Sequence, residues 1–262
     1  MIVASLRGLI LKLIIPLKAY LKDLIKGDMG PSMKYTGRDV DEIINYSFPS
    51  SAKLGAVAVV LSLVLGVVLG IIAALNHNRW PDSICMVLAT LGVTIPSFVL
   101  ATVLMYIFGI KYQILPITGL DNWKNYILPV LALSGYSIAF ISRLARSKLL
   151  EVMKSDYIRT ARAKGVNERS IIIKHALRNT LIPIVTYLGP LIAGILTGSF
   201  VVEKIFAIPG LGREFVTTIT NRDYTVVMGV TVFYSALLII CNLIVDILYV
   251  VIDPRIKLEN IE

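Results

Sequence analysis

Five long uncharged segments divide the chain, and each is long enough to cross a membrane as a helix. They contain no Asp, Glu, Lys or Arg and are Leu54–Leu75, Ser83–Ile110, Asn125–Ser142, Asn179–Val202 and Thr225–Val245. A helix needs about 17–25 residues to cross a hydrocarbon core of roughly 30 Å. A charge at mid-bilayer costs about 2.5–3.5 kcal/mol on insertion scales. The pattern therefore predicts an all-α, polytopic transmembrane helix bundle with five complete spans.

The alternative is a large soluble protein with buried helices, and it fits the sequence poorly. Such helices normally carry a polar face at the helical period, which these segments lack. The composition agrees, because 56% of the residues are hydrophobic and only 16% are charged, against roughly 45–50% and about 25% in soluble domains. Both cysteines, Cys85 and Cys241, fall inside predicted spans, so the sequence predicts neither a disulfide nor a thiolate metal site.

The net charge of +9 is concentrated in one loop. Three acids, Glu151, Asp156 and Glu168, oppose ten bases there. The bases are Arg143, Arg146, Lys148, Lys154, Arg159, Arg162, Lys164, Arg169, Lys174 and Arg178. Because basic loops stay in the cytoplasm, this loop is expected inside. Alternation of the spans then places Lys111–Lys124 and Glu203–Tyr224 outside.

The N-terminal region fits the span pattern less simply. It carries seven Lys or Arg residues before position 49, yet the Leu54–Leu75 span should enter from outside. Gly8–Leu17 is apolar but too short to cross, which favours an interfacial helix, and Leu17–Ile44 is expected to be an amphipathic external segment. The expected parts are an extracytoplasmic segment at 1–48, a transmembrane domain at 49–252 with a cytoplasmic loop at 143–182, and a cytoplasmic tail at 253–262.

Prolines and glycines inside the spans have two interpretations. Pro96 lies in the middle of one span, and Gly189, Pro190, Gly194 and Gly198 lie in another. A proline frees a backbone carbonyl and bends a helix, whereas small residues four apart let two helices approach closely. Ordinary helix packing explains both features. The functional interpretation is a bent helix that lines the bundle and can rock.

The cytoplasmic loop is expected to form two short helices. Tyr157–Lys164 has good helix formers, and Gly165 follows where a left-handed C-terminal cap would stand. Asn167 can cap a second helix, with Glu168 favourable in its first turn. Ile173, Leu177 and Leu181 recur at intervals of four residues, which predicts one apolar side for this helix. A rigid docking surface for another protein, a solvated basic loop and a site for anionic lipid all remain open.

Enzyme motifs are absent from the sequence. It contains no Gly-x-x-x-x-Gly-Lys-Ser/Thr loop for nucleotide phosphates, no His-Glu-x-x-His and no Gly-x-Ser-x-Gly. An intramembrane enzyme is a remote alternative, and a secondary transporter is another. A secondary transporter would want ionisable groups near the midplane, and the spans offer only Asp246, close to the cytoplasmic end of its helix.

Six stretches in order resemble one transporter family, and the resemblance covers about residue 17 to the end. The cytoplasmic loop Tyr157–Gly165, followed by His175–Asn179 and Pro183, resembles the signature loop of bacterial ABC importer permeases, in the B-type subunit of the peptide/nickel branch. The other matching stretches are Gly27–Ser32, Val202–Gly212, Asn221–Tyr224 and Asp246 through Asp253–Ile256.

The resemblance implies a type I ABC importer permease fold, usually with six spans. This chain lacks a convincing first span, which a truncation, a mis-assigned start or a five-span form would each explain. Arg159-Thr160-Ala161 and Gly165 occupy the places of the family's Glu-Ala-Ala…Gly motif, with Arg and Thr replacing Glu and the first Ala. The implied docking surface for the ATPase is Asp156, Tyr157, Arg159, Thr160, Ala161, Arg162, Ala163, Lys164 and Gly165.

The resemblance also implies the partners. They are a homologous second permease subunit, two ATP-binding subunits that hold ATP and Mg, an extracytoplasmic solute-binding protein and the lipid bilayer, with no nucleic acid. This chain would be a multi-pass transporter subunit in the cytoplasmic membrane of a prokaryote, with no cofactor of its own. Di- or oligopeptides are the implied substrates, nickel or another small solute being the alternative, and no substrate-binding residue can be named.

The external stretch Phe206–Gly212 is expected to form a compact turn through Pro209, Gly210 and Gly212, before a short helix from Arg213. Its place in the chain suggests an outer gate or a contact for the binding protein. A simple connector is the other interpretation.

Overall fold

The computed structural model describes residues 22–24 and 27–252, apart from the side chains of 197, 198 and 248–252. The expectations for the interfacial Gly8–Leu17 helix and for the tail at 253–262 lie outside these residues. The described chain contains helices and a single isolated bridge between Pro31 and Asp39, with no strand. The all-α prediction is confirmed.

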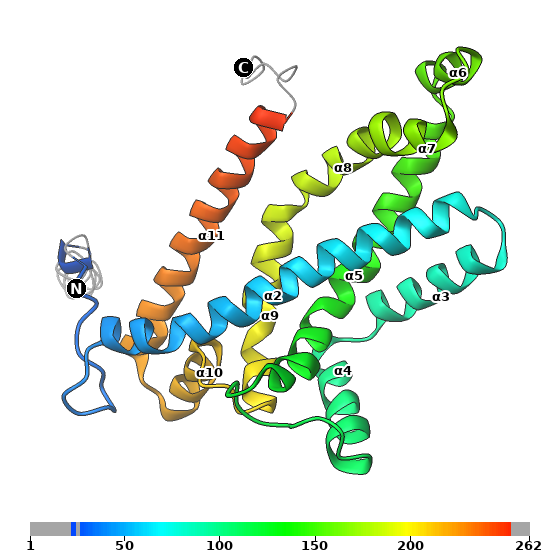
Figure 1. Cartoon of the computed structure of the whole chain (residues 1–262). Helices are drawn as coiled ribbons and strands as arrows, with labels where there is room; N and C mark the ends of the chain where they lie inside the picture. The colour runs from blue at the N-terminus through cyan, green and yellow to red at the C-terminus, as the bar shows by residue number, and fades with distance from the viewer. Residues whose placement is uncertain (1–21, 25–26, 253–262) are drawn as a thin grey trace, which may run out of the picture.

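The helices are named as in Figure 1. Their bounds are α2 Val40–Leu75, α3 Trp80–Thr94, α4 Ser97–Leu104, η1 Met105–Lys111, α5 Trp123–Met153, α6 Asp156–Ala163, α7 Glu168–Ser170, η2 Ile171–Ala176, α8 Leu177–Thr186, α9 Leu188–Ile205, α10 Leu211–Asn221 and α11 Tyr224–Ile252. Both η segments are π-helices. Helix α2 begins at Val40, so the last residues of the predicted external segment, which ends at Ile44, already belong to this helix.

Four described helices, α2, α5, α9 and α11, are long and apolar enough to cross a membrane. The fifth candidate is a broken pair in which α3 and the α4–η1 segment meet at 106°. The count of five predicted spans is reached when this pair is taken as one span. Residues 83–110 therefore form two helical segments, and the bend that the functional interpretation expected at Pro96 is present.

The bundle has two distinct ends, which we call the α6 end and the α10 end (Figure 1). The α6 end carries α6, α7, the last turn of α2 and the first turn of α3. The α10 end carries α10, the first turn of α2 and the loop 112–122, where the Gly119 N–H donates to the Phe206 carbonyl at 3.1 Å. These groupings agree with the alternation expected from the sequence.

Close packing between α2 and α5 forms the centre of the fold. Buried small residues repeat along α2 at intervals of four, at Ala58, Ser62, Gly66 and Gly70. A Cβ on Gly66 would lie 2.7 Å from Ile141, and one on Gly70 would lie 2.6 Å from the Ser142 carbonyl. These glycines let two long helices touch along their backbones. At Gly194, by contrast, a Cβ would meet no atom of this chain within 4 Å.

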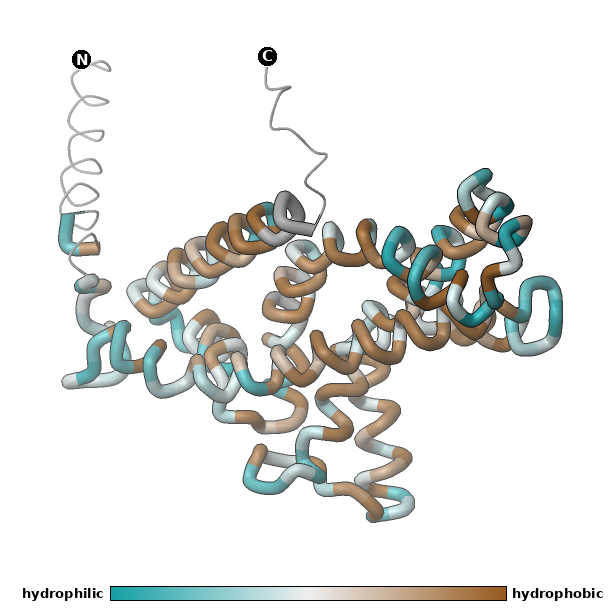
Figure 2. The backbone as a smooth tube through the Cα atoms, turned by 45° about the horizontal axis from the view of Figure 1, so that its top comes forward, coloured by the Kyte–Doolittle hydropathy of each residue, from teal (hydrophilic) through white to brown (hydrophobic). Residues whose placement is uncertain are grey.

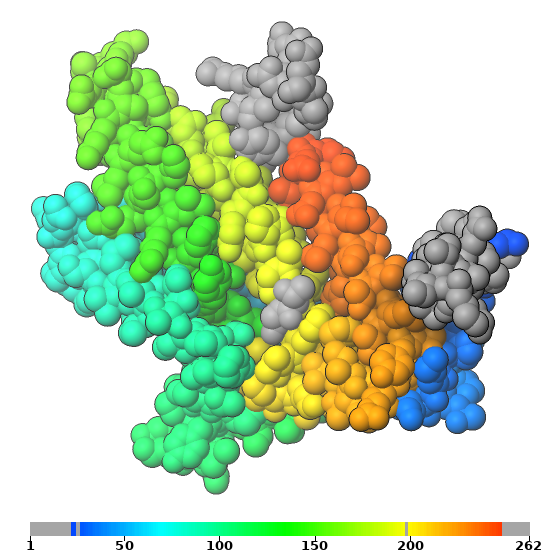
Figure 3. All heavy atoms as spheres, turned by 180° about the vertical axis from the view of Figure 1, so that it is seen from behind, coloured from blue at the N-terminus to red at the C-terminus, as the bar shows by residue number. Residues whose placement is uncertain are grey.

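Large apolar side chains cover the outside of the bundle. On α11, Ile239, Leu243 and Ile247 are more than half exposed, and α2 and α3 carry similar rows. Figure 2 shows these helices as mostly hydrophobic, whereas the α6–α7 region is hydrophilic. Figure 3 shows α3, α4, α9, α10 and α11 together on the face seen from behind. Exposed apolar stripes on long helices are what a lipid environment or a second helical subunit would cover.

Candidate functional site

A protruding hairpin at the α6 end consists of α6, α7 and the turn between them, residues 156–170 (Figure 1). Gly165 has φ +76°, its N–H donates to the Arg162 carbonyl at 2.9 Å, and the Val166 N–H donates to the Ala161 carbonyl at 3.2 Å. These two bonds make a Schellman cap, in which a left-handed residue satisfies the last helix carbonyls. The left-handed helix cap predicted at Gly165 is confirmed.

The second half of the hairpin is capped as expected. The Asn167 side chain accepts a hydrogen bond from the Arg169 N–H at 3.0 Å, which satisfies a donor in the first turn of α7. Across the turn, Arg162 Nε and Glu168 Oε1 are 2.6 Å apart. Since both side chains are about half exposed, this ion pair fixes the angle of the hairpin more than it stabilises the fold.

One side of α6 packs on the bundle. Ile158 is fully buried among Leu149, Ile171 and Ala176, and Ala161 and Val166 pack partly against the same group. Eight of the nine predicted docking residues are exposed, and Ala161 instead packs partly on this cluster. The exposed eight are Asp156, Tyr157, Arg159, Thr160, Arg162, Ala163, Lys164 and Gly165.

A polar contact adds to this anchor. The Asn179 amide donates to the Tyr157 hydroxyl at 2.6 Å, which ties the first turn of α6 to α8. The hairpin is therefore held to the bundle from its inner side, and its outer side presents charged and hydroxyl groups.

The apolar side predicted for the second helix is wrong in its register. Ile173 is 64% exposed, whereas Ile171, Ala176, Thr180 and Ile184 are buried. The cause is the π-helical segment η2, which adds one residue to a turn. Consequently Ile171 and Ala176 are five residues apart, whereas Ala176, Thr180 and Ile184 follow at the ordinary interval of four.

A buried ion pair lies between the hairpin and the spans. Arg146 of α5 donates to both carboxylate oxygens of Asp82 of α3, at 2.6 and 2.7 Å, and its guanidinium is 3.1 Å from His77 Nδ1. The Asp82 side chain is only 5% exposed. This two-pronged contact joins the first turn of α3 to α5 at the α6 end.

The turn at Phe206–Gly212 surrounds a buried carboxylate. Glu203 was expected in an external loop, but it lies in the last turn of α9 and is fully buried. Its Oε2 accepts from the Arg213 N–H at 3.1 Å, in the first turn of α10. The Ser51 hydroxyl of α2 accepts from the Leu211 N–H at 2.9 Å. Side chains from two helices thus hold the start of α10.

The glycines of this turn are required by space. A Cβ on Gly210 would collide with Glu203 Oε2 and lie 2.6 Å from Ser51 Oγ, and one on Gly212 would lie 2.8 Å from the Phe200 Cα. Phe206 is buried, and Pro209 is exposed. The predicted compact turn is confirmed, and α10 begins at Leu211 rather than at Arg213.

The stretches Gly27–Ser32 and Asn221–Tyr224, far apart in the sequence, meet at the α10 end. Asp223 is fully buried, and its carboxylate accepts from the Ser32 hydroxyl at 2.5 Å and from the Met33 and Lys34 N–H groups at 3.2 and 3.3 Å. Burial alone would raise the pKa of Asp223. These bonds and one from the Val226 N–H outweigh it and lower the pKa.

The break between α3 and α4 opens into a cavity of about 480 Å³. Pro96 has no N–H, so the carbonyl of Gly92 loses its helical donor. Most of its lining residues are apolar, and none of those described is charged. Five carry hydroxyl groups: Thr94, Ser97, Tyr136, Ser137 and Tyr187. The Phe140 ring lies tilted against the Tyr187 ring, with 4.3 Å between centroids.

Non-helical backbone at membrane depth occurs only where protein covers it or where it lines a water-filled cavity. The cavity is therefore a candidate for a transport pathway. Sequence reasoning named Pro96 but none of the hydroxyl residues, because a Ser or Tyr in a span carries no signal by itself. Among the described residues, no group of three or more His, Cys, Asp or Glu side chains could hold a metal ion.

Comparison with known proteins adds sequence relatives. A family model for binding-protein-dependent transport system inner membrane components matches residues 66–258. The dipeptide transport system permease protein DppB of Bacillus subtilis is 49% identical over 241 residues, covering 92% of this chain and 78% of that protein. The oligopeptide transport system permease protein OppB of Salmonella typhimurium is 49% identical over 242 residues, covering 91% and 79%.

Solved structures share the fold at low sequence identity. Inward-facing MetNI methionine ABC transporter has a chain that superposes with a TM-score of 0.68 at 16% identity, covering 80% of this chain and 96% of that one. A chain of an amino acid ABC transporter superposes at 0.63 with 15% identity, covering 79% and 93%. Both likenesses concern the fold, and they agree with the expected importer permease architecture.

Proposed function

Because the chain belongs to the family of binding-protein-dependent transport system inner membrane components, we propose that it forms half of the pathway of an ATP-driven importer for di- or oligopeptides. The relatives named above carry peptide transport in their names, at about half identity over nine-tenths of this chain. The cavity at the α3–α4 break supports peptides over nickel. Its hydroxyl groups can bond to amide groups, and it lacks the imidazole and thiolate ligands that nickel prefers.

The protruding hairpin is the observation that carries the proposal. A transmembrane subunit without a nucleotide-binding loop must receive the work of ATP hydrolysis through contact with another chain. The hairpin presents eight exposed side chains and backbone positions on an element anchored by Ile158 and Tyr157. We propose that it inserts into a cleft of an ATPase subunit and that the α6 end accordingly faces the cytoplasm.

The remaining partners follow from this arrangement. A second, homologous permease subunit would cover part of the exposed apolar surface and complete the pathway. Two ATPase subunits holding ATP and Mg would bind the two hairpins, and a solute-binding protein would deliver peptide at the α10 end. Closure of the ATPases would then shift the two permease halves from inward-facing to outward-facing. The cytoplasmic membrane of a prokaryote is the proposed location.

Paired single-cysteine variants test the orientation and the docking together. In a background with Cys85→Ala and Cys241→Ala, Thr160→Cys probes the hairpin and Thr220→Cys probes α10, since both threonines are exposed and lie at opposite ends. We expect Thr160→Cys to cross-link to an ATPase subunit and to resist impermeant maleimide added outside intact cells. Thr220→Cys should behave in the opposite way. External labelling of Thr160→Cys, or no cross-link in an assembled and active complex, would reject the proposal.

A further inference from the structure

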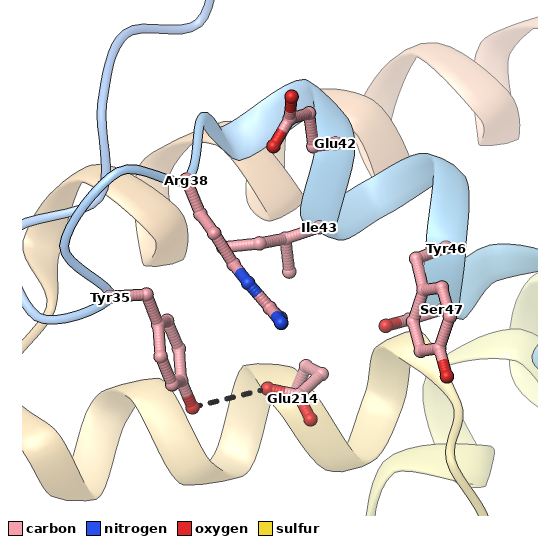
Figure 4. Close-up of a pocket in the computed structure, with 7 residues that line it drawn as sticks. All are labelled: Tyr35, Arg38, Glu42, Ile43, Tyr46, Ser47 and Glu214. Carbon is pink, nitrogen blue, oxygen red and sulfur yellow. Dashed lines mark hydrogen bonds between the residues drawn. The ribbon is translucent and has the colours of Figure 1, made fainter.

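A second, polar cavity of about 530 Å³ lies at the α10 end. It is bounded by the segment before α2, the first turns of α2, and α10 (Figure 4). Seven residues line it: Tyr35, Arg38, Glu42, Ile43, Tyr46, Ser47 and Glu214. Its volume falls within the roughly 300–1,000 Å³ of small-ligand sites. In contrast to the cavity at the α3–α4 break, charged groups of both signs face this one.

Arg38 provides the positive charge of this cavity. Figure 4 shows its side chain reaching into the middle of the cavity. The guanidinium forms no ion pair or hydrogen bond with any residue that the structure describes. Its backbone is fixed, however, because its N–H donates to the Tyr35 carbonyl at 3.1 Å and its carbonyl accepts from the Ser32 N–H at 3.0 Å. The residue is exposed, and its planar guanidinium offers five N–H donors that can bind a carboxylate.

Two carboxylates line the same space. Glu214 comes from α10, and its Oε2 is 3.4 Å from the Tyr35 hydroxyl (Figure 4). Glu42 comes from the first turn of α2. Burial and the neighbouring Glu214 carboxylate raise the pKa of Tyr35, so this hydroxyl stays a neutral donor. The cavity therefore carries one positive group and two negative groups that do not neutralise one another.

A ligand that matches these walls needs an anionic group for Arg38 and a cationic group for the glutamates. We propose that the cavity binds a short peptide by its free termini, with the terminal carboxylate on Arg38 and the terminal ammonium on Glu214. The inference rests on the proposed function, and it makes this cavity a receiving site at the entrance. Tyr46, 79% exposed, offers aromatic surface to peptide side chains without a closed pocket, so peptides of different sequence fit.

The test is peptide binding to the assembled permease and ATPase complex in nanodiscs, without the binding protein. Radiolabelled trialanine is compared with trialanine amide, which lacks the carboxylate, and with N-acetyl-trialanine, which lacks the ammonium. Removing one charge-assisted contact should weaken binding roughly tenfold or more. Trialanine should thus bind better than either blocked peptide.

Variants assign each preference to a residue. Arg38→Gln should bind trialanine and its amide equally, and Glu214→Gln should lessen the preference against the acetylated peptide. Arg38→Lys, which keeps the charge without the fork, should lie between Arg38→Gln and the parent. Lys34→Gln is the matched control, because Lys34 is an exposed base on the same segment that does not line the cavity. It should bind like the parent.

Three results would overturn the inference. The parent complex could bind all three peptides equally, or Arg38→Gln could keep the parent's preference. Alternatively, Arg38→Gln could leave peptide binding unchanged and weaken only the docking of the binding protein. Arg38 would then bind a carboxylate of that protein and not the peptide terminus. Uptake of trialanine by vesicles with the complete system is measured in parallel. If vesicles take up trialanine but the complex binds the three peptides equally, this site is rejected and the import function stands. If the complex binds trialanine preferentially but the vesicles take up none, the import function is rejected and the site stands.

Discussion

Substituting Gly165 by valine isolates the contribution of the hairpin turn. The residue has φ +76°, and an added Cβ would meet no atom within 4 Å. The cost of the substitution is therefore backbone strain alone, about 1–3 kcal/mol for a β-branched residue in the left-handed region. The strain is relieved if the Schellman cap opens, which releases the bonds to the Arg162 and Ala161 carbonyls.

The size of this strain determines where the damage appears. It is small beside the packing of the long helices, but the hairpin rests on few contacts, chiefly Ile158 with partial packing from Ala161 and Val166. A shift of 1–3 kcal/mol changes the ratio of closed to open turn by roughly 5- to 150-fold. We expect membrane insertion and docking of the binding protein to persist, while peptide uptake and transport-stimulated ATP hydrolysis fall together.

The assay combines a pull-down of the ATPase subunits with uptake in membrane vesicles. Gly165→Asn is the matched control, because asparagine tolerates the left-handed region, and it should retain most activity. Gly165→Ala should fall between the two. If Gly165→Val binds the ATPases and transports like the parent, the hairpin is a charged connector and the coupling argument fails.

Four further substitutions or conditions probe the rest of the structure. Gly210→Leu should abolish uptake while the ATPases stay bound, since its side chain would collide with Glu203; normal uptake, as expected for Pro209→Ala, would make this turn a connector. Arg146→Ala leaves the Asp82 carboxylate unpaired and should destabilise the complex by up to about 3 kcal/mol in thermal unfolding, with Asp82→Asn relieving part of the loss; equal stability would contradict the ion pair. Because the pKa of Asp223 is lowered, its carboxylate stabilises the fold fully above its unfolded pKa of about 3.9 and ever less as pH falls through the lower folded value, so the midpoint of thermal unfolding should drop in acid more for the parent than for Asp223→Asn. Ala161→Leu should impair uptake by crowding the packed side of α6, whereas Arg159→Ala, which loses an exposed pair, should change it little.

Much of the fold could be predicted because lipid imposes a strong local requirement on sequence. Uncharged runs located every helix that crosses the bundle, and Gly165 and Asn167 marked a turn whose geometry depends only on neighbouring residues. The start of α2 was not predicted, because the prediction located helices by uncharged runs. Val40–Phe48 carries polar and charged residues, yet it continues the helix because Ile43 and Ile44 pack on α10 and α11 neighbours such as Leu211 and Val226.

Contacts between distant residues could not be predicted. Nothing near Glu203 in the chain indicates that its carboxylate is enclosed by the start of α10, and Ser32 pairs with Asp223 across 191 positions. The Ile173 register failed because a π turn cannot be identified from hydrophobic spacing that assumes 3.6 residues per turn. The first two features depend on residues far away in the chain, and the third depends on a local change in helix type.

The placement of these contacts suggests how force applied at the hairpin could reach the cavity at the α3–α4 break. Ile158 packs against Leu149 of α5 and lies in the same cluster as Ala74 of α2, and Arg146 fixes the first turn of α3 to α5. These contacts join the hairpin, α2, α3 and α5 at the α6 end. Farther along α3 the helix ends at Thr94 and restarts at Ser97, with a bend of 106° and a proline that cannot donate a backbone bond. The helix has lost a backbone hydrogen bond at this break, where the cavity lies, so we expect relative motion of α3 and α4 to be concentrated there.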